Sequence, residues 1–477
     1  MSEFDLCVIG GGSGGLVAAA GGATLGAKVA LVENNKLGGE CLWTGCVPSK
    51  ALLRSAEVAQ TMRDASRFGV PAASPKPKLA DVMQRVAQVI KAIEPHDSPE
   101  RFRGLGVEVI LGAGHFTDPQ TFEVNGRRVT AKKFVLATGS RAAVPPIAGI
   151  DEVPVLTNET LFDLREEVAH LIVLGAGPIG CEMAQAFCRL GSEVDVIEMS
   201  ARILDKDDFD LAEVVFERLR MDGVRFHLGQ EVARAQGGKG SVRLTLQAKN
   251  GQERVIAATH LLIAAGRKPN LDGLELSRAR VKVEHGRLVV DERFRTSNKN
   301  IYACGDVAGG YQFTHMAEYQ AGIVLRNALF HLPAKAAAHA VPWCTFTDPE
   351  LARVGLSESE ARRQNVPHKI FRFEFADIDR AQAEGETAGF AKVITDPKGN
   401  LLGAVIVGRH AGELIHEYVL AVTKRMKISD LTGAIHIYPT LAQINRRAAD
   451  MQLKAQLTPF KKKLLRWIFG LRGGRDH

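Results

Sequence analysis

The chain reads DLCVIGGGSGG at residues 5–15 and HLIVLGAGPIG at residues 170–180, and this repeated pattern decides the fold. In each copy an apolar strand runs into three spaced glycines that open a helix, and a second strand follows. That second strand ends in an acid, Glu33 or Glu198, which stands 23 positions after the first glycine in both copies. The shared spacing predicts two copies of one βαβ unit.

The glycines of each unit have three different physical roles. The first allows the tight turn from strand to helix, the second lets a pyrophosphate approach the backbone, and the third lets the helix pack closely on the strand. The helix N-terminus offers free N–H groups to the phosphates, and the acid can accept hydrogen bonds from an adenosine ribose. One such pattern alone could be only a glycine-rich turn, but two complete units predict two bound dinucleotides. The glycines concerned are Gly10, Gly12, Gly15, Gly175, Gly177 and Gly180.

Composition and charge narrow the class of protein. A chain of 477 residues, 45% hydrophobic and 24% charged, with 47 glycines, is typical of a folded α/β protein with two to four domains. The N-terminus lacks the basic and apolar regions of a signal peptide, and every apolar run is interrupted, so we expect a cytoplasmic protein. Most of the net charge of +7 comes from residues 458–477. The rest of the chain is nearly neutral, which argues against a nucleic-acid partner.

Two of the seven cysteines lie close together in GECLWTGCVPSK, residues 39–50. Cys41 and Cys46 would point roughly 140° apart on a regular helix, but Gly45 and Pro48 allow a distortion that brings the sulfurs together. Seven cysteines are too few for a disulfide scaffold in a chain of this length, so a disulfide here is expected to be catalytic. A metal site is the main alternative, although it would need further Cys or His ligands nearby, and a pair of inert core cysteines is the second.

These motifs together resemble those of the flavoprotein disulfide reductases, the family of lipoamide dehydrogenase, glutathione reductase and mercuric reductase. The resemblance is greatest to the bacterial mercuric reductase-like group and extends from about Phe4 to Arg447. It implies an α/β fold with two Rossmann-like dinucleotide-binding domains, one for FAD and one for NAD(P), followed by an α+β C-terminal dimerisation domain. The further segments that occur in the family's order are FVLATGS at 134–140, LIAAGRKPN at 262–270, IYACGD at 301–306 and TDPE at 347–350.

The resemblance also implies how the chain is divided and that it forms a homodimer. In the family the C-terminal segment of one subunit completes the site of the other, so an isologous dimer is expected. The Tyr438–Pro439 peptide bond is expected to be cis. The implied segments are 1–147 for FAD and the redox disulfide, 148–270 for NAD(P), 271–340 for a second part of the FAD site, 341–459 for the interface domain, and 460–477 for a basic amphipathic tail.

The resemblance further assigns roles to individual residues. Hydride from the nicotinamide nucleotide reduces FAD, which reduces the disulfide; Cys41 then meets the substrate while Cys46 lies against the flavin. Lys50 lies near the flavin and pairs with Glu182, unless both are solvated surface charges. The implied FAD-binding residues are Gly10, Gly12, Gly15, Glu33, Lys50, Gly114, Thr138, Gly139, Asp306 and Thr314, and the implied NAD(P)-binding residues are Gly175, Gly177, Gly180, Glu198 and Gly266.

The second acidic residue bears on the choice of nicotinamide nucleotide. Glu198 would bind a free ribose diol and repel a 2′-phosphate, which favours NADH. The nearby Arg202 leaves NADPH as the alternative.

The C-terminal segment HIYPTLAQ, residues 436–443, departs from the family pattern. Lipoamide dehydrogenase and glutathione reductase have a histidine where this chain has Tyr438, and a glutamate where it has Gln443. A phenol with an ordinary pKa of roughly 10 is a poor base at neutral pH, and an amide cannot make a histidine more basic. His436 could act instead, but a structural role suits its position better. Mercuric reductase has a tyrosine at this place, so a soft metal ion is the nearest analogy, although the chain lacks that enzyme's C-terminal cysteine pair.

The tail beyond residue 459 lies outside the part of the chain that resembles the family. Apolar residues 464, 465, 468 and 471 share one helical face, and lysines and arginines surround them. Such a helix is typical of an anchor that lies on the inner face of a membrane. The alternative is a terminal helix packed on its own dimer.

Three functions are therefore open. The first is an NAD(P)H-dependent reductase whose acceptor is a small disulfide, a thiol-bound metal ion or a similar small molecule. The second is a membrane-associated electron-transfer flavoprotein that reduces a quinone or a membrane partner. The third, an FAD-binding scaffold without redox chemistry, is disfavoured by the two complete cofactor folds and by Cys41 and Cys46.

Overall fold

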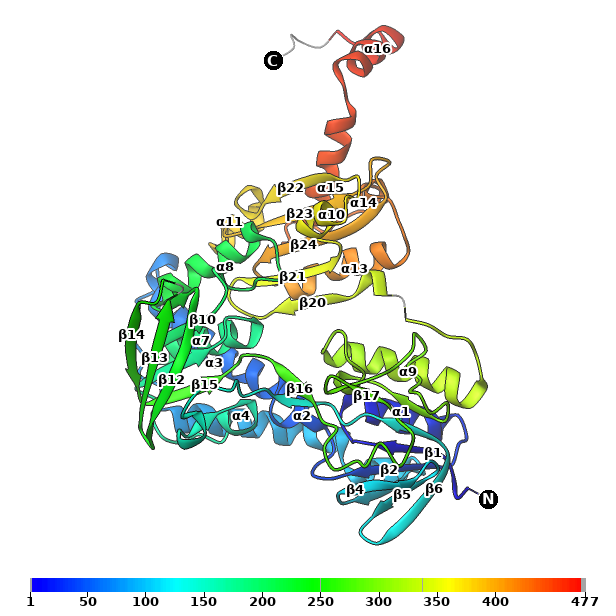
Figure 1. Ribbon diagram of the computed structural model, residues 1–477. Helices are drawn as coiled ribbons and strands as arrows, with labels where there is room; N and C mark the ends of the chain where they lie inside the picture. Colours follow the sequence, from blue (N-terminus) through cyan, green and yellow to red (C-terminus); the bar gives the residue numbers. More distant parts are fainter. Residues whose placement is uncertain (1, 249, 337, 473–477) are drawn as a thin grey trace. The chain divides into compact units, whose positions relative to one another are not determined.

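The computed structural model describes residues 2–248, 250–336 and 338–472, and the chain divides into two compact units (Figure 1). The larger unit is formed by Met1–Ile203 and Asp222–Ala337, and the smaller unit by Leu204–Met221 and Ala338–His477. This division is coarser than the five segments expected from the sequence, whose boundaries stay predictions.

The first sheet of the larger unit is built around the N-terminal glycine pattern. Its strand order is β3-β2-β1-β6-β5-β4, and β19 also pairs with β6. The pairs among β1, β2, β3, β6 and β19 are parallel, whereas β4, β5 and the start of β6 form an antiparallel meander. The strands are β1 Phe4–Ile9, β2 Val29–Glu33, β3 Glu108–Leu111, β4 Gly114–Asp118, β5 Thr121–Val124, β6 Arg127–Leu136 and β19 Ile301–Ala303.

Both faces of this sheet are covered, which explains why its central strands are almost wholly apolar. On one face Leu6 and Val8 belong to a buried cluster with residues of α1 (Ser13–Thr24) and α9 (Thr314–Phe330). On the other face the buried cluster includes Phe116 and Phe122 of the β4–β5 hairpin. Helix α1 therefore has a fixed place, with its N-terminus following directly on the end of β1.

The second sheet of the larger unit repeats this construction around the second glycine pattern. Its five strands are parallel in the order β11-β10-β9-β15-β8, and an antiparallel sheet β12-β13-β14 is the next one along the chain. The elements are β8 Val155–Leu156, β9 His170–Leu174, α7 Pro178–Leu190, β10 Glu193–Glu198, β11 Arg225–Leu228, β12 Gln230–Gly238, β13 Ser241–Ala248, β14 Glu253–Ala258 and β15 His260–Ile263.

Shorter elements complete the larger unit. Strand β7, which follows β6 in the chain, pairs antiparallel with β16, which follows β15. The remaining elements are α2 Gly39–Trp43, α3 Cys46–Asp64, α4 Leu79–Ile93, α5 Pro99–Gly104, β7 Ser140–Ala142, α6 Asn158–Leu161, β16 Arg267–Pro269, β17 Val283–Glu284 and β18 Arg287–Leu288.

The smaller unit is an α+β fold around one antiparallel sheet of order β20-β21-β24-β23-β22. Residues from its strands and from α13, α14 and α15 form a common buried core. Its strands are β20 Pro342–Thr345, β21 Glu350–Gly355, β22 Lys369–Glu374, β23 Phe390–Thr395 and β24 Leu401–Gly408. Its helices are α8 Phe209–Asp222, whose last residue belongs to the larger unit, α10 Glu358–Arg363, α11 Asp379–Glu384, α12 Ala411–Leu414, α13 His416–Thr423, α14 Ile428–Gly433, α15 Gln443–Gln456 and α16 Pro459–Phe469.

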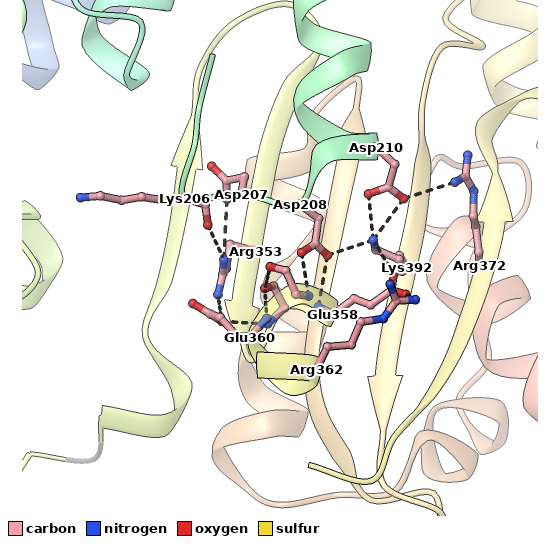
Figure 2. Close-up of polar contacts among 12 residues, drawn as sticks. Lys206, Asp207, Asp208, Asp210, Arg353, Glu358, Glu360, Arg362, Arg372 and Lys392 are labelled. Carbon is pink, nitrogen blue, oxygen red and sulfur yellow. Dashed lines mark hydrogen bonds and ion pairs between the residues drawn. The ribbon is translucent and has the colours of Figure 1, made fainter. Parts of the chain in front are cut away.

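Buried ion pairs fasten the start of α8 to this sheet (Figure 2). Lys392 of β23, 2% exposed, places Nζ 2.9 Å from Asp208 Oδ2, 2.9 Å from Asp210 Oδ1 and 3.0 Å from Glu358 Oε2. Asp208 also accepts the backbone N–H groups of residues 358 and 359 at the start of α10. The pKa of Asp208 is therefore held well below its ordinary value by hydrogen bonds that outweigh the cost of burial.

We expect Lys392→Met to lower the free energy of unfolding by about 3 to 5 kcal/mol, because the nearly buried carboxylate of Asp208 loses its ammonium partner. Guanidinium titration followed by circular dichroism measures the change. Lys132→Met is the matched control, since the ammonium of Lys132 is two-thirds exposed and pairs with Asp5 at the surface; it should change the free energy by no more than about 1 kcal/mol. Equal effects of the two substitutions would contradict a stabilising role for the buried cluster.

Candidate active site

Cys41 and Cys46 lie on two different helices. This agrees with the prediction that their sulfurs could not meet on one regular helix. Cys41 is in α2, and Cys46 is the first residue of α3. Thr44 and Gly45 separate the helices, and a Cβ at Gly45 would lie 2.9 Å from the carbonyl oxygen of Glu40. The break is thus tightly folded, and it requires glycine. Both cysteines are free thiols here, and no group of three His, Cys, Asp or Glu side chains suited to a metal ion occurs among the residues that the structure describes.

The two sulfurs interact directly. The Cys41 thiol donates a hydrogen bond to Cys46, and this bond is the largest cause that lowers the pKa of Cys46 to about 6. The hydroxyl of Thr314, 3.4 Å from the Cys46 sulfur, and the charge of Lys50 lower this pKa further, against the effect of burial. The same thiol–thiolate bond raises the pKa of Cys41. The hydrogen bond therefore favours a thiolate on Cys46 beside a thiol on Cys41.

The ion pair expected between Lys50 and Glu182 is present. Lys50 Nζ lies 2.8 Å from Glu182 Oε2, and the Glu182 side chain is only 6% exposed. Lys50 is one turn along α3 from Cys46, and Glu182 is in α7, the helix that follows the second glycine loop. A buried carboxylate at this distance excludes the alternative of two solvated surface charges.

The two glycine loops are braced by their acids in the same way. Glu33 accepts hydrogen bonds from the N–H groups of Gly11 at 2.6 Å and Asn35 at 2.7 Å. Glu198 accepts the corresponding bonds from Ala176 and from Ser200, both at 2.8 Å. Each carboxylate thus ties the end of the second strand to the first turn of its loop, a role that the sequence analysis did not foresee. Lone pairs remain on both carboxylates for a ribose hydroxyl.

The surroundings of the glycines fit bound dinucleotides. A Cβ at Gly15 would lie 1.8 Å from the carbonyl oxygen of Gly10, and a Cβ at Gly180 would lie 2.0 Å from that of Gly175. Nothing lies within 4 Å of a Cβ at Gly177, and the N-termini of α1 and α7 have no side-chain cap. The third glycine is therefore required by packing, while the second leaves the backbone N–H groups open to a phosphate, as expected.

The other predicted cofactor residues fall into two groups. Asp306 accepts a hydrogen bond from the hydroxyl of Ser140. Thr138 exchanges hydrogen bonds with Asn270, just after β16. Gly139, the residue after Thr138, has a φ of +68°, and Gly266, the residue before β16, has a φ of +126°. Gly114 instead lies in the β4–β5 hairpin, where a Cβ would lie 2.4 Å from the ring of Phe122. Packing explains that glycine without a cofactor, and its predicted FAD contact stays a prediction.

The C-terminal candidates lie in the smaller unit, in the turn before α15. The Tyr438–Pro439 bond is cis, as predicted. Tyr438 is 66% exposed, and its hydroxyl donates to Asp379 Oδ2 at 2.9 Å. His436 directs Nε2 to Glu417 Oε1 at 2.9 Å and Nδ1 to the carbonyl oxygen of residue 434 at 3.2 Å. Because both of its ring nitrogens face acceptors within the unit, the geometry favours the structural role of His436 over that of a base.

Three interacting residues, Ser13, Glu417 and Asp379, were not predicted from the sequence, nor was one contact of Thr314. The pKa of Cys41 is affected by a hydrogen bond with Ser13, which stands inside the quoted glycine loop and so could have been noticed. Thr314 was expected to contact FAD, but the structure also places it against Cys46. Glu417 and Asp379, the partners of the C-terminal histidine and tyrosine, had no signal, because they are distant in sequence from that turn and follow no motif.

Two protein-family models match this chain. The model described as pyridine nucleotide-disulphide oxidoreductase matches residues 4–321, and the model of the dimerisation domain of the same family matches residues 341–449. Together they span both compact units.

Individual proteins are similar over nearly the whole chain. A mercuric reductase of Bacillus cereus is 35% identical over 92% of this chain and 70% of its own length. A dihydrolipoyl dehydrogenase of Chlamydia muridarum is 36% identical over 95% of this chain and 98% of its own length. Among solved structures, the Cu(II) complex of the HOCl-induced flavoprotein disulfide reductase RclA from Escherichia coli is 28% identical, with a TM-score of 0.84, and the match covers 94% of this chain and 100% of that one.

We expect the rate of Cys46 alkylation by iodoacetamide to rise with pH around a midpoint near 6, because the thiolate is the nucleophile. Cys41→Ala should move this midpoint upward by at least about one unit, since the alanine methyl group donates no hydrogen bond to the thiolate. Mass spectrometry of the reduced protein measures the rates. Cys344→Ser, in the other unit, is the control and should leave the midpoint unchanged; an ordinary thiol midpoint in the unaltered protein would contradict the proposed thiolate.

Proposed function

The chain belongs to the pyridine nucleotide-disulphide oxidoreductase family, and we propose that it passes electrons from NADH through FAD and the Cys41–Cys46 pair to a soft metal ion. The chain is an oxidoreductase with FAD and a pyridine nucleotide as cofactors, and its acceptor is a disulfide or a metal ion. Its dimerisation domain supports a homodimer. The choice of acceptor and the roles of individual residues are the proposal.

The environment of Cys46 is the observation that carries the proposal. The first glycine loop would hold FAD, which when bound supplies two-electron redox chemistry. Uptake of two electrons and one proton by the disulfide yields a Cys46 thiolate and a Cys41 thiol. Thr314 and Lys50 stabilise the thiolate, and Glu182 holds Lys50 in place. The thiolate favoured on Cys46 and the proton on Cys41 suit them to the flavin-facing and substrate-facing roles that the resemblance implies.

The C-terminal turn favours a metal ion over a disulfide as the acceptor. Reduction of a disulfide releases thiolates that must be protonated, which in related enzymes calls for a histidine paired with a carboxylate. Here hydrogen bonding to Asp379 raises the pKa of Tyr438, and Gln443 donates its amide to the carbonyl oxygens of residues 436 and 437. Neither side chain is a base at neutral pH. Two similar proteins, a mercuric reductase and a reductase whose structure was solved as a Cu(II) complex, agree with a metal acceptor.

NADH is the favoured nucleotide. Glu198, already held by two backbone N–H groups, would bond the ribose diol and repel a 2′-phosphate. The nearby Arg202 keeps NADPH as the alternative.

Under anaerobic conditions we expect NADH to reduce the protein and expose the two thiols, and the reduced protein to turn over Hg(II) or Cu(II) salts. Cys41→Ala should keep its FAD but lose at least about 100-fold in turnover, because the dithiol is broken. Cys344→Ala is the matched control with normal turnover. Faster reduction of lipoamide or oxidised glutathione than of every metal complex would contradict the metal acceptor, and undiminished turnover in Cys41→Ala would contradict the role of the pair.

A second candidate function follows from helix α16. No residue of α16 is buried, Trp467 is 81% exposed, and Lys461, Lys462, Lys463 and Arg466 surround the apolar side chains. The helix ends at Phe469, so Leu471, expected on the same helical face, lies beyond it, and residues 473–477 of the tail lie outside the described part of the chain. An exposed apolar surface among cations is complementary to an anionic lipid surface, where the protein would reduce a membrane acceptor such as a quinone. None of the helices in the described ranges has the length and apolar character to span a bilayer.

Sedimentation with lipid vesicles tests this second candidate. The protein should bind vesicles that contain phosphatidylglycerol and not vesicles of phosphatidylcholine alone, and Trp467→Ala with Ile468→Ala should weaken binding about tenfold, since apolar area is lost. Phe330→Ala, at an exposed apolar position on α9, is the control. Loss of the dimer instead of vesicle binding in the double variant would show that α16 packs on the partner subunit.

A further inference from the structure

We propose that two residues of the second dinucleotide-binding unit position the Cys41–Cys46 pair through Glu40. The inference rests on the redox role proposed above for this pair and deepens it by naming the groups that hold the sulfurs together. Glu40 directly precedes Cys41 in α2. Its carboxylate accepts hydrogen bonds from Asn158 and Arg267, which both lie in the part of the chain expected to bind NAD(P). All of these residues belong to the larger unit.

The turn between the cysteines needs support from outside itself. Helix α2 has only 5 residues, which is too short to be stable on its own. The carbonyl groups at the end of a helix also lack partners within it. The positions of both sulfurs therefore depend on contacts that other parts of the chain make with this turn.

Asn158 ties the two ends of the turn to one another. Its side-chain amide donates to Glu40 Oε1 at 3.1 Å and to the carbonyl oxygen of Thr44 at 3.4 Å. The Glu40 side chain also lies against Gly45, since a Cβ at that glycine would be 3.4 Å from Glu40 Cγ. One neutral amide thus joins the residue just before the first cysteine to a residue two positions before the second.

Both partners of Glu40 are held by contacts of their own. Asn158 is the first residue of α6, whose N-terminus is closed by a capping box. Arg267 is mostly buried, and it donates from Nε to Ser140 Oγ at 2.7 Å and from Nη2 to the Ser140 carbonyl oxygen at 3.0 Å. The short turn between the cysteines is therefore held against two side chains that are already fixed.

The charge of Glu40 and its hold on the turn affect Cys46 in opposite directions. Burial raises the pKa of Glu40 to about 7, and Arg267 opposes this rise while the charge of Cys46 adds to it. The same repulsion disfavours a thiolate on Cys46. Loss of the carboxylate through its charge alone would lower the pKa of Cys46, whereas loss of its hold on the turn would weaken the hydrogen bond from Cys41 and raise that pKa.

Glu40→Ala and Asn158→Ala test the inference, with Glu159→Ala as the matched control at the next, exposed position of α6. In the reduced holoprotein, both variants should raise the midpoint of Cys46 alkylation by iodoacetamide by at least about half a pH unit, because the Cys41 thiol no longer stays within hydrogen-bond reach. Glu159→Ala should keep the midpoint of the unaltered protein. Flavin absorbance and circular dichroism establish that each variant is folded.

A second measurement follows the disulfide itself. In a glutathione buffer, the protein dithiol and oxidised glutathione exchange to give the protein disulfide and two molecules of reduced glutathione. Asn158→Ala changes no charge, and it should shift this equilibrium about tenfold toward the dithiol, because a looser turn brings the sulfurs together less often. Mass spectrometry after acid quenching and alkylation gives the ratio of the two forms, and an unshifted ratio would contradict the inference.

Combination with Cys41→Ala separates positioning from a general effect on the larger unit. In that background neither Glu40→Ala nor Asn158→Ala should raise the Cys46 midpoint further, because the hydrogen bond through which they act is absent. An unchanged or lowered midpoint in either single variant, or a rise that persists without the Cys41 thiol, would overturn the inference and leave the redox role of the pair intact. An unaltered midpoint in Cys41→Ala itself would instead count against the thiol pair of the proposed function.

Discussion

The hydrogen bond from the Cys41 thiol to the Cys46 sulfur depends on one break in helical structure. Five residues of continuous helix would carry the sulfurs to opposite sides, so α2 must end and α3 must begin between them. Gly45 permits the break, since its Cβ position lies against the carbonyl oxygen of Glu40. Once the sulfurs meet, the preference of one for the thiolate follows from its neighbours, Thr314 and Lys50.

The rest of the larger unit holds those neighbours in place. Thr314 begins α9 and Lys50 belongs to α3, and the acid that orients Lys50 comes from the helix of the second glycine unit. The two βαβ units thus contribute to one charge arrangement, in addition to their own phosphate-binding loops. Their equivalence reaches the level of single hydrogen bonds, because Glu33 and Glu198 brace corresponding N–H groups.

The smaller unit carries the departures from the family pattern. Its sheet is fixed to the start of α8 by buried ion pairs. At position 438 its C-terminal turn has a tyrosine that bonds Asp379, while His436, two positions earlier, pairs with Glu417.

Sequence alone determined the two βαβ units and the closely spaced cysteines, because each follows from local geometry, and the resemblance of the motifs indicated the family. Glycines at fixed spacing are required wherever a strand turns into a helix beneath a phosphate, and so they can be read without a structure. The pairing of Lys50 with Glu182 was also available, through the resemblance. Only the tertiary structure decided which sulfur is the thiolate, that both His436 nitrogens are engaged, and that Asp379 holds Tyr438. These depend on side chains that lie tens or hundreds of positions apart in the chain, and no periodicity or spacing records which of them meet when the sheets and helices pack.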